Sequence, residues 1–201
     1  MTRRTLVIFL KAPKAGRVKT RLGREIGAAR AALLCRRMTE LTLREARGPW
    51  RTILAIDPPS ALYGWRGLWG ASFERMAQAQ GDLGARMRAA MRAVRAGPVV
   101  LIGADAPGLR AAHIRAAFKA LGAADAVFGP ATDGGYWLMG LARRRPAPRL
   151  FENVRWSSPD ALADTLASLP PSFGVARLPV LRDVDEAADL CALGPLLLSA
   201  R

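Results

Sequence analysis

One residue whose type and position could support chemistry on phosphate groups is Asp105. It follows the short apolar run 99–102 and stands two residues before Pro107. Such a run, bounded by turn residues, is typical of a strand buried on both faces. A carboxylate at the carboxyl end of that strand could hold a hard metal ion against phosphate oxygens. The alternative is that Asp105 only caps the helix that follows.

A basic loop at residues 11–22 is a second candidate. It follows the apolar run 5–10 and contains one glycine, Gly16, together with five cationic residues. A strand that leads through a glycine-containing loop into a helix is a common geometry for phosphate binding. Lys19 and Arg21 could donate charge-assisted hydrogen bonds to phosphate oxygens. The loop has too few glycines for a Walker or GxGxxG motif, so a basic surface loop remains an alternative.

A third candidate is the acid Asp133, which is followed directly by Gly134 and Gly135. Two glycines after an acid let the backbone turn sharply beside a ligand. The alternative is a tight hairpin turn that joins two strands and has no role in binding.

The length and composition of the chain indicate one domain over residues 1–201. Its 201 residues are 51% hydrophobic, which is enough for a full core. No apolar run approaches the ~20 residues that span a bilayer, and the run at 5–10 is too short for a signal peptide. The sequence therefore predicts a cytoplasmic protein without a membrane span. A monomer and a homodimer are both compatible with it.

The formal net charge of +15 comes almost wholly from arginine. A charge of this sign favours anionic partners such as nucleotides, nucleic acids or phosphorylated metabolites. Scattered arginines most often form a solvated surface, so the charge does not choose among these partners. A non-catalytic nucleic-acid-binding protein is a remote alternative that the charge suggests. No recognition-helix, zinc-finger or RNP-like pattern is present, however, and we do not expect a specific nucleic-acid partner.

Two cysteines and one histidine are predicted to have packing roles. Cys35 and Cys191 lie far apart, with no further cysteine or histidine at metal-binding spacing, which indicates buried free thiols. His113 has no acidic partner nearby in the sequence, which indicates a surface or packing histidine.

Strand and helix patterns alternate along the chain. Asp82 is a natural N-cap for the helix that opens there, and Ser158 is the expected cap of a later one. The pattern predicts a three-layer α/β/α fold with a mostly parallel, Rossmann-like sheet. The expected strands are 5–10, 51–56, 73–78, 99–102, 125–128, 137–141 and 175–178, and the expected helices are 25–46, 83–94, 111–121, 160–169 and 181–198.

Six motifs occur in a fixed order over residues 6–190, and as a set they resemble one bacterial family of transferases. These are GT-A-type enzymes known as arsenosugar-biosynthesis or selenodomain-associated glycosyltransferases. The set is more distantly similar to the guanylyltransferases of molybdenum cofactor and of phospholactate activation. The motifs are Pro13-x-x-Gly16-x-Val18-Lys19-Thr20-Arg21-Leu22, Gly81-Asp82-Leu83-Gly84-x-Arg86, Gly103-x-Asp105-x-Pro107, Gly129-Pro130-x-x-Asp133-Gly134-Gly135-Tyr136, Trp156-Ser157 and Asp183-Val184-Asp185.

The resemblance implies a nucleotide-diphospho-sugar transferase fold and a bound Mg²⁺ or Mn²⁺. It implies metal ligation by Asp105 and Asp185, with Asp183 as a substitute for the latter, and contact of Lys19 and Arg21 with the diphosphate. Asp133 is the candidate catalytic base, with Lys19 and Arg21 as catalytic cations. The implied nucleotide- and phosphate-binding residues are Pro13, Gly16, Lys19, Arg21, Asp82, Arg86 and Gly103, and those on the acceptor or sugar side are Asp133, Gly134, Gly135, Tyr136, Trp156 and Ser157.

Two enzymatic functions fit these residues. The first is transfer of a sugar from a nucleotide-diphosphate donor to a small-molecule acceptor, with the metal bridging the two phosphates. The second is nucleotidyl transfer, in which a nucleoside triphosphate and a phosphorylated metabolite give pyrophosphate. The same basic loop and acids would serve both reactions, although one glycine gives a triphosphate little backbone to lie against.

Overall fold

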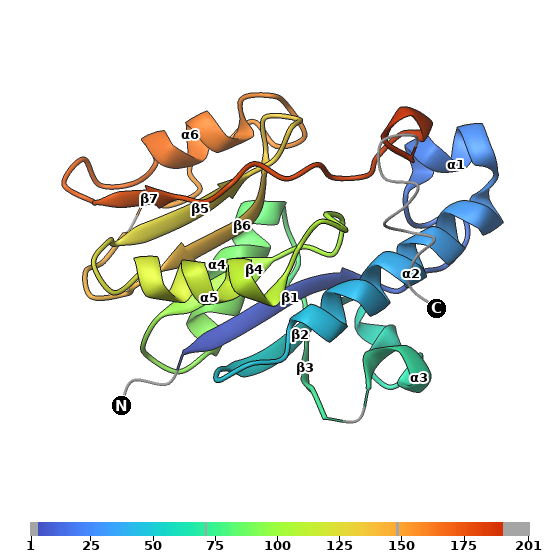
Figure 1. Ribbon diagram of the computed structural model, residues 1–201, viewed down its shortest axis with the longest axis horizontal. Helices are drawn as coiled ribbons and strands as arrows, with labels where there is room; N and C mark the ends of the chain where they lie inside the picture. The colour runs from blue at the N-terminus through green and yellow to red at the C-terminus, as the bar shows by residue number, and fades with distance from the viewer. Residues whose placement is uncertain (1–3, 71, 148, 191–201) are drawn as a thin grey trace.

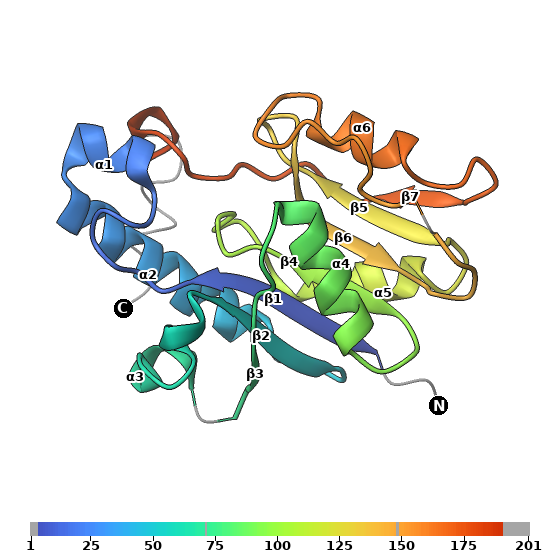
Figure 2. The same cartoon turned by 180° about the vertical axis from the view of Figure 1, so that it is seen from behind.

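A computed structural model describes residues 4–70, 72–147 and 149–190 and shows a three-layer α/β/α arrangement (Figures 1 and 2). The central layer is a seven-stranded sheet with the order β3-β2-β1-β4-β6-β5-β7. This confirms the predicted fold class. The strands are β1 (Thr5–Lys11), β2 (Arg51–Asp57), β3 (Glu74–Ala77), β4 (Val99–Ile102), β5 (Ala126–Pro130), β6 (Tyr136–Leu141) and β7 (Val175–Arg177).

The strand directions bring distant loops to one edge of the sheet. Strand β1 pairs in parallel with β2 and β4, whereas β6 runs antiparallel to both β4 and β5. The strands β1, β4 and β5 therefore point the same way, and their carboxyl ends meet at the edge that we call the site edge. The loops that carry Lys19, Asp105 and Asp133 all leave the sheet there.

Helices cover both faces of the sheet, which explains the unbroken apolar runs of the central strands. On one face, α2 (Ala28–Glu45) and α5 (Ala111–Ala120) pack on the sheet, and on the other, α4 (Leu83–Ala93) and α6 (Ala161–Ala167) do. All four residues of β4 are buried. A strand between two helical layers has no polar face, because its side chains alternate between two cores.

The N-terminal helical region differs from the prediction of one helix over 25–46. The structure has α1 (Thr20–Ile26) and α2, which are separated at Gly27. Gly27 has a φ of 91°, a backbone conformation that ends one helix and lets the next begin at a new angle. The segment after β2 also becomes regular in places, as the 3-10 turn Pro59–Ala61 and the short α3 (Arg66–Trp69).

The loop 131–135 is a connection between antiparallel strands, so the hairpin expected as an alternative is present. The last predicted helix does not begin at 181: Leu181 forms a parallel bridge with Ala131, and helical residues start only at 187. The remainder of that helix, and Cys191, lie outside the described residues. Among the described helices, none is both long and apolar enough to cross a membrane.

Candidate active site at the carboxyl edge of the sheet

A lysine held between two carboxylates is the centre of the site edge. The ammonium nitrogen of Lys19 lies 2.8 Å from Oδ1 of Asp105 and 2.8 Å from Oδ1 of Asp185. The Lys19 side chain is 7% exposed, whereas those of Asp105 and Asp185 are 57% and 47% exposed. The two acids thus present oxygens to solvent around a nearly buried cation. The structure brings together the predicted diphosphate-binding lysine and the predicted metal ligands.

The basic loop positions Lys19 through its backbone. Lys19 has the left-handed conformation, with φ 46° and ψ 49°, immediately before α1. The N–H of Ala12 donates to the carbonyl of Asp57, which fixes the start of the loop. Val18 is buried against α2, and Pro13 is buried as well. Gly16 has a φ of 74° and has open space where a side chain would begin, so a ligand could approach its backbone.

Asp105 does not cap the helix that follows it. The helix α5 begins after Arg110, and the N–H of Arg110 donates to Nδ1 of His113. The interpretation of Asp105 as a helix cap is therefore wrong. His113 is a packing residue, as predicted, because its ring also lies 5.5 Å from the Trp137 ring.

Asp185 reaches the site through an extended segment, residues 178–186, which runs from β7 across the site edge toward α1 (red in Figure 1). The N–H of Leu181 donates to the carbonyl of Pro130, and the N–H of Val184 donates to the carbonyl of Asp105. Val184 is fully buried in a cluster with Leu22 of α1 and two residues of α2. These contacts hold Asp185 beside the N-terminal half of the protein.

The charges at the site shift two pKa values in ways that follow from their surroundings. Burial alone would lower the pKa of Lys19, but the charges and hydrogen bonds of Asp105 and Asp185 more than offset it and raise this pKa above the usual lysine value. Burial, and then the negative charge of Asp133, raises the pKa of Asp183 to about 6. The acids Asp133, Asp183 and Asp185 therefore share one electrostatic environment.

The loop after β5 is fixed by close backbone packing. Oδ1 of Asp133 accepts a hydrogen bond from the N–H of Gly135 at 2.8 Å. Gly134 has a φ of 85°, and a Cβ there would lie 2.1 Å from the carbonyl oxygen of Pro159. Tyr136 is largely buried, which raises the pKa of its phenol above the usual range. This packing explains the glycine at position 134, and Asp133 stays exposed at the surface.

The predicted phosphate-binding residues of the second motif have structural contacts of their own. The carboxylate of Asp82 accepts from the N–H of Ala85 at 2.7 Å and caps α4, as the sequence predicts. Arg86 donates to the carbonyl of Gly81 and lies 3.7 Å from the carboxylate of Asp57. Both residues are at the site edge, near the carboxyl end of β2.

The remaining candidates are placed less centrally. The N–H of Gly103 donates to the carbonyl of Trp137 at 3.4 Å, directly after β4. Trp156 packs on Phe151 with ring centroids 6.1 Å apart, on the α4 and α6 face of the sheet. Ser157 is exposed, with a φ of 59°. Ser158 does not occupy the N-cap of α6; its hydroxyl instead accepts from the N–H of Asp160 at 3.2 Å.

Arg21 is exposed on the first turn of α1 and does not share the buried position of Lys19. The ammonium of Lys19 is directed at the carboxylates of Asp105 and Asp185, a contact that local sequence patterns do not predict. The signal that could have found this contact is the coincidence of one lysine and two acids in loops that share a sheet edge.

The donor set fits a divalent cation that is completed by substrate oxygens. Among the described residues, no three His, Cys, Asp or Glu side chains are arranged to hold a metal ion by themselves. Asp105 and Asp185 nevertheless converge on one cation, the Lys19 ammonium, and keep solvent-exposed oxygens. Mg²⁺ is typically held by one or two carboxylates together with phosphate oxygens and water.

Cys35 lies beneath the basic loop, and we expect its thiol to be unreactive. Burial, and then the charge of Asp105, raises its pKa to about 11. The thiol is therefore protonated at pH 8, and the thiolate is the reactive form. Titration of the native proteins with a chromogenic disulfide at pH 8 should detect the same number of fast-reacting thiols in the wild type and in Cys35→Ser. In denaturant, the wild type should show one more reactive thiol than the variant. An extra fast-reacting thiol in the native wild type would contradict the burial of Cys35.

Several solved structures share this architecture. A protein from Desulfovibrio desulfuricans G20, provisionally assigned as a nucleotide-diphospho-sugar transferase, is 28% identical with a TM-score of 0.83, covering 97% of this chain and 88% of that one. Rv0371c from Mycobacterium tuberculosis H37Rv, in complex with manganese, is 20% identical with a TM-score of 0.58 and full coverage of both chains. The 4-diphosphocytidyl-2C-methyl-D-erythritol synthase of Anaerococcus prevotii is 10% identical, with a TM-score of 0.63 and coverage of 98% and 96%.

These likenesses confirm the fold that the motif set implies, that of the nucleotide-diphospho-sugar transferases. No sequence among curated proteins matches the chain significantly. One family description, that of uncharacterized proteins conserved in bacteria, matches residues 41–158. That match covers more than half of the chain and includes β4, Asp105 and Asp133. The chain therefore belongs to the bacterial protein family DUF2064.

Proposed function

We propose that this protein is a metal-dependent transferase of GT-A type, formed by one domain over residues 1–201. It moves a sugar from a nucleotide-diphosphate donor to a small-molecule acceptor. The observation that carries the proposal is the position of Lys19 between Asp105 and Asp185 at the site edge. The likeness to the Desulfovibrio protein at 28% identity supports the same class of reaction.

In this proposal Asp105 and Asp185 would hold Mg²⁺ or Mn²⁺, which would supply positive charge against the departing nucleotide when bound. Lys19 turns from the carboxylates to the diphosphate, and Arg21 adds a guanidinium that binds phosphate oxygens in a bidentate manner. Both cations stabilise the negative charge that develops as the nucleotide leaves. The backbone of Gly16 admits the phosphates, with Pro13 fixing the loop and Gly103 leaving room after β4.

Asp133 is the proposed acceptor-side acid. Its carboxylate orients an acceptor hydroxyl and removes its proton, the role of a general base. Its exposed place in the turn after β5 supports this role, because a substrate hydroxyl can approach the carboxylate there. The other proposed acceptor-side residues are Gly134, Gly135, Tyr136, Trp156 and Ser157.

Nucleotidyl transfer is the second candidate. The likeness to the inositol-1-phosphate CTP transferase of T. maritima, with a TM-score of 0.59 at 14% identity, favours it through the fold. The same acids and cations would serve a nucleoside triphosphate. The basic loop contains one glycine, Gly16, which makes a diphosphate the better fit to its backbone.

Two assays on the full chain separate the candidates. The first follows release of pyrophosphate from the four common nucleoside triphosphates, each with Mn²⁺ and a panel of phosphorylated sugars. The second follows hydrolysis or transfer of nucleotide-diphosphate-sugars with Mn²⁺. Donor turnover in the second assay without pyrophosphate release supports sugar transfer. Pyrophosphate release with no donor turnover assigns the chain as a nucleotidyltransferase, and inactivity in both contradicts each proposal.

Lys19→Met is expected to separate metal binding from turnover. Removal of the ammonium leaves Asp105 and Asp185 facing one another without a cation, so affinity for Mn²⁺ without nucleotide should rise, by about tenfold. Turnover of the donor should fall by about a hundredfold, because the charge on the leaving group loses a stabilising partner. Calorimetry with Mn²⁺ and the donor assay measure the two effects.

Lys14→Met is the matched control, since Lys14 is an exposed lysine of the same loop. It should leave both quantities within about twofold of the wild type. Equal losses of turnover in the two variants would show that only the overall charge of the loop matters.

A further inference from the structure

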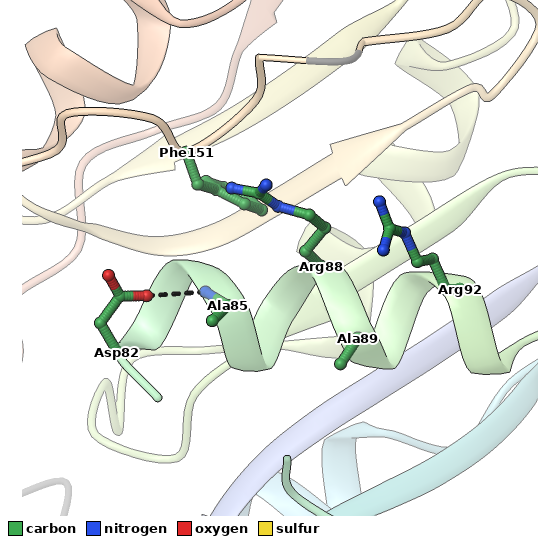
Figure 3. Close-up of a pocket in the computed structure, with 6 residues that line it drawn as sticks. All are labelled: Asp82, Ala85, Arg88, Ala89, Arg92 and Phe151. Carbon is green, nitrogen blue, oxygen red and sulfur yellow. Dashed lines mark hydrogen bonds between the residues drawn. The ribbon is translucent and has the colours of Figure 1, made fainter. Parts of the chain in front are cut away.

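A groove lined by arginines runs along α4, on the sheet face opposite to α2 and α5. Its two adjoining parts have cavity volumes of about 280 Å³ and about 450 Å³ and share Arg88 and Arg92. Figure 3 shows both arginines projecting from the same side of α4, with Arg88 alongside the ring of Phe151. The second part extends to residues 141–147 and to Leu150. The larger of the two volumes is in the range of small-molecule sites.

The groove combines an apolar lining with positive charge. Met91, Leu141, Leu150 and Phe151 line it, and each is at most 7% exposed because most of its side chain packs into the core. Among the described residues, the only acid that lines either part is Asp82, and its carboxylate already accepts a hydrogen bond from the N–H of Ala85.

The other arginines of the groove are already engaged. Arg143 and Arg144 donate to backbone carbonyl oxygens of neighbouring turns. Arg145 forms an ion pair with Asp125 and lies over the ring of Phe173. These three residues join loops of the fold, so their guanidinium groups have structural partners.

Arg88 and Arg92 differ from them. Within residues 4–70, 72–147 and 149–190, neither forms an ion pair or a side-chain hydrogen bond. The Nε atom of Arg88 is buried without an acceptor. Two like charges four residues apart on a helix repel each other, and a buried donor without an acceptor is costly. An anion placed between the two guanidinium groups would relieve the repulsion between them.

The groove adjoins the candidate active site at Asp82, which lines its first part, but the two arginines without a partner among the described residues lie on another side of α4. Arg86 is directed at Gly81 and Asp57 near the end of β2, and Arg88 stands two positions further along the helix. Residues two apart on a helix do not share a face. A ligand on Arg88 therefore lies on another side of α4 than a ligand on Arg86.

We propose that this groove is a second binding site for an organic phosphate. The phosphate group bridges the guanidinium groups of Arg88 and Arg92, and a flat apolar body covers Leu150 and Phe151. Arginine suits this role because its planar fork matches phosphate oxygens and its face packs on rings.

Phenyl phosphate is a direct probe, because it joins a phosphate to a flat apolar ring. Calorimetry at ~0.15 M salt with the full chain should show saturable binding, tighter than that of inorganic phosphate and with phenol not binding. Arg88→Gln and Arg92→Gln should each weaken it by about tenfold, the loss of one charge-assisted contact. Arg92 is exposed, so its replacement tests the site even if Arg88→Gln disturbs packing.

Two controls make the result specific. Arg115→Gln removes one exposed charge from α5, on the opposite face of the sheet, and should leave phenyl phosphate binding unchanged. Asp105→Asn alters the candidate active site and should also leave it unchanged. Equal weakening of phenyl phosphate binding in Arg115→Gln and Arg92→Gln would show that binding depends only on the overall positive charge, which would overturn the proposal. Weakening in Asp105→Asn, or no saturable binding in the wild type, would likewise overturn the proposal.

Discussion

Asp105→Asn is expected to abolish metal-dependent nucleotide binding. The amide keeps the shape of the side chain but removes the negative charge that a divalent ion requires. Even substitutions of groups that only support metal ligands cost 10- to 100-fold in affinity, so loss of a ligand charge should cost at least about a hundredfold. Calorimetric titration of a nucleotide diphosphate, with and without Mn²⁺, measures the effect.

The control for this prediction is metal-free nucleotide binding, which should change little. Lys19 and Arg21 remain to attract phosphates, and Lys19 loses one of its two carboxylate partners. Asp185→Asn should reproduce the loss if both acids hold the metal. Intact Mn²⁺-dependent binding in Asp105→Asn would show that the metal assignment is wrong.

Gly134→Ala is expected to destabilise the protein strongly. Its Cβ would lie 2.1 Å from the carbonyl oxygen of Pro159, and the residue has a φ of 85°. The left-handed conformation costs a non-glycine residue about 1 kcal/mol, and relief of the clash with the backbone costs about 2 kcal/mol more. For a chain of this size, the loss of about 3 kcal/mol lowers the Tm by about 10 °C. Thermal unfolding followed by circular dichroism measures it.

Gly16→Ala separates the two contributions. Gly16 has a φ of 74° but nothing within 4 Å of a Cβ, so its replacement brings backbone strain without a clash. We expect a Tm lower by about 3 °C. If Gly134→Ala unfolds at the same temperature as Gly16→Ala, the contact between the 131–135 loop and Pro159 is looser than the structure has it.

Much of the layered fold could be predicted from local patterns. The apolar runs at β1 and β4 predict strands buried on both faces, and the apolar stripe of α4 with Asp82 before it predicts a capped helix. The spacing of apolar residues did not predict the break at Gly27. Apolar residues continue at helical spacing through this position, whereas the backbone there is not helical. The direction of β6 could not be predicted from the sequence either, because an apolar run does not specify which strand it pairs with or whether the pairing is parallel or antiparallel.

The sequence by itself determined which residues could do chemistry and that their loops would leave one edge of the sheet. Strand order and tertiary packing decided which of them meet. The contact between Lys19 and Asp185 joins residues 166 positions apart, and it exists because the segment 178–186 is anchored by Val184 beside α1. Local patterns specify helices, strands and turns, whereas the side-chain geometry of a site depends on contacts between residues that are distant in the chain.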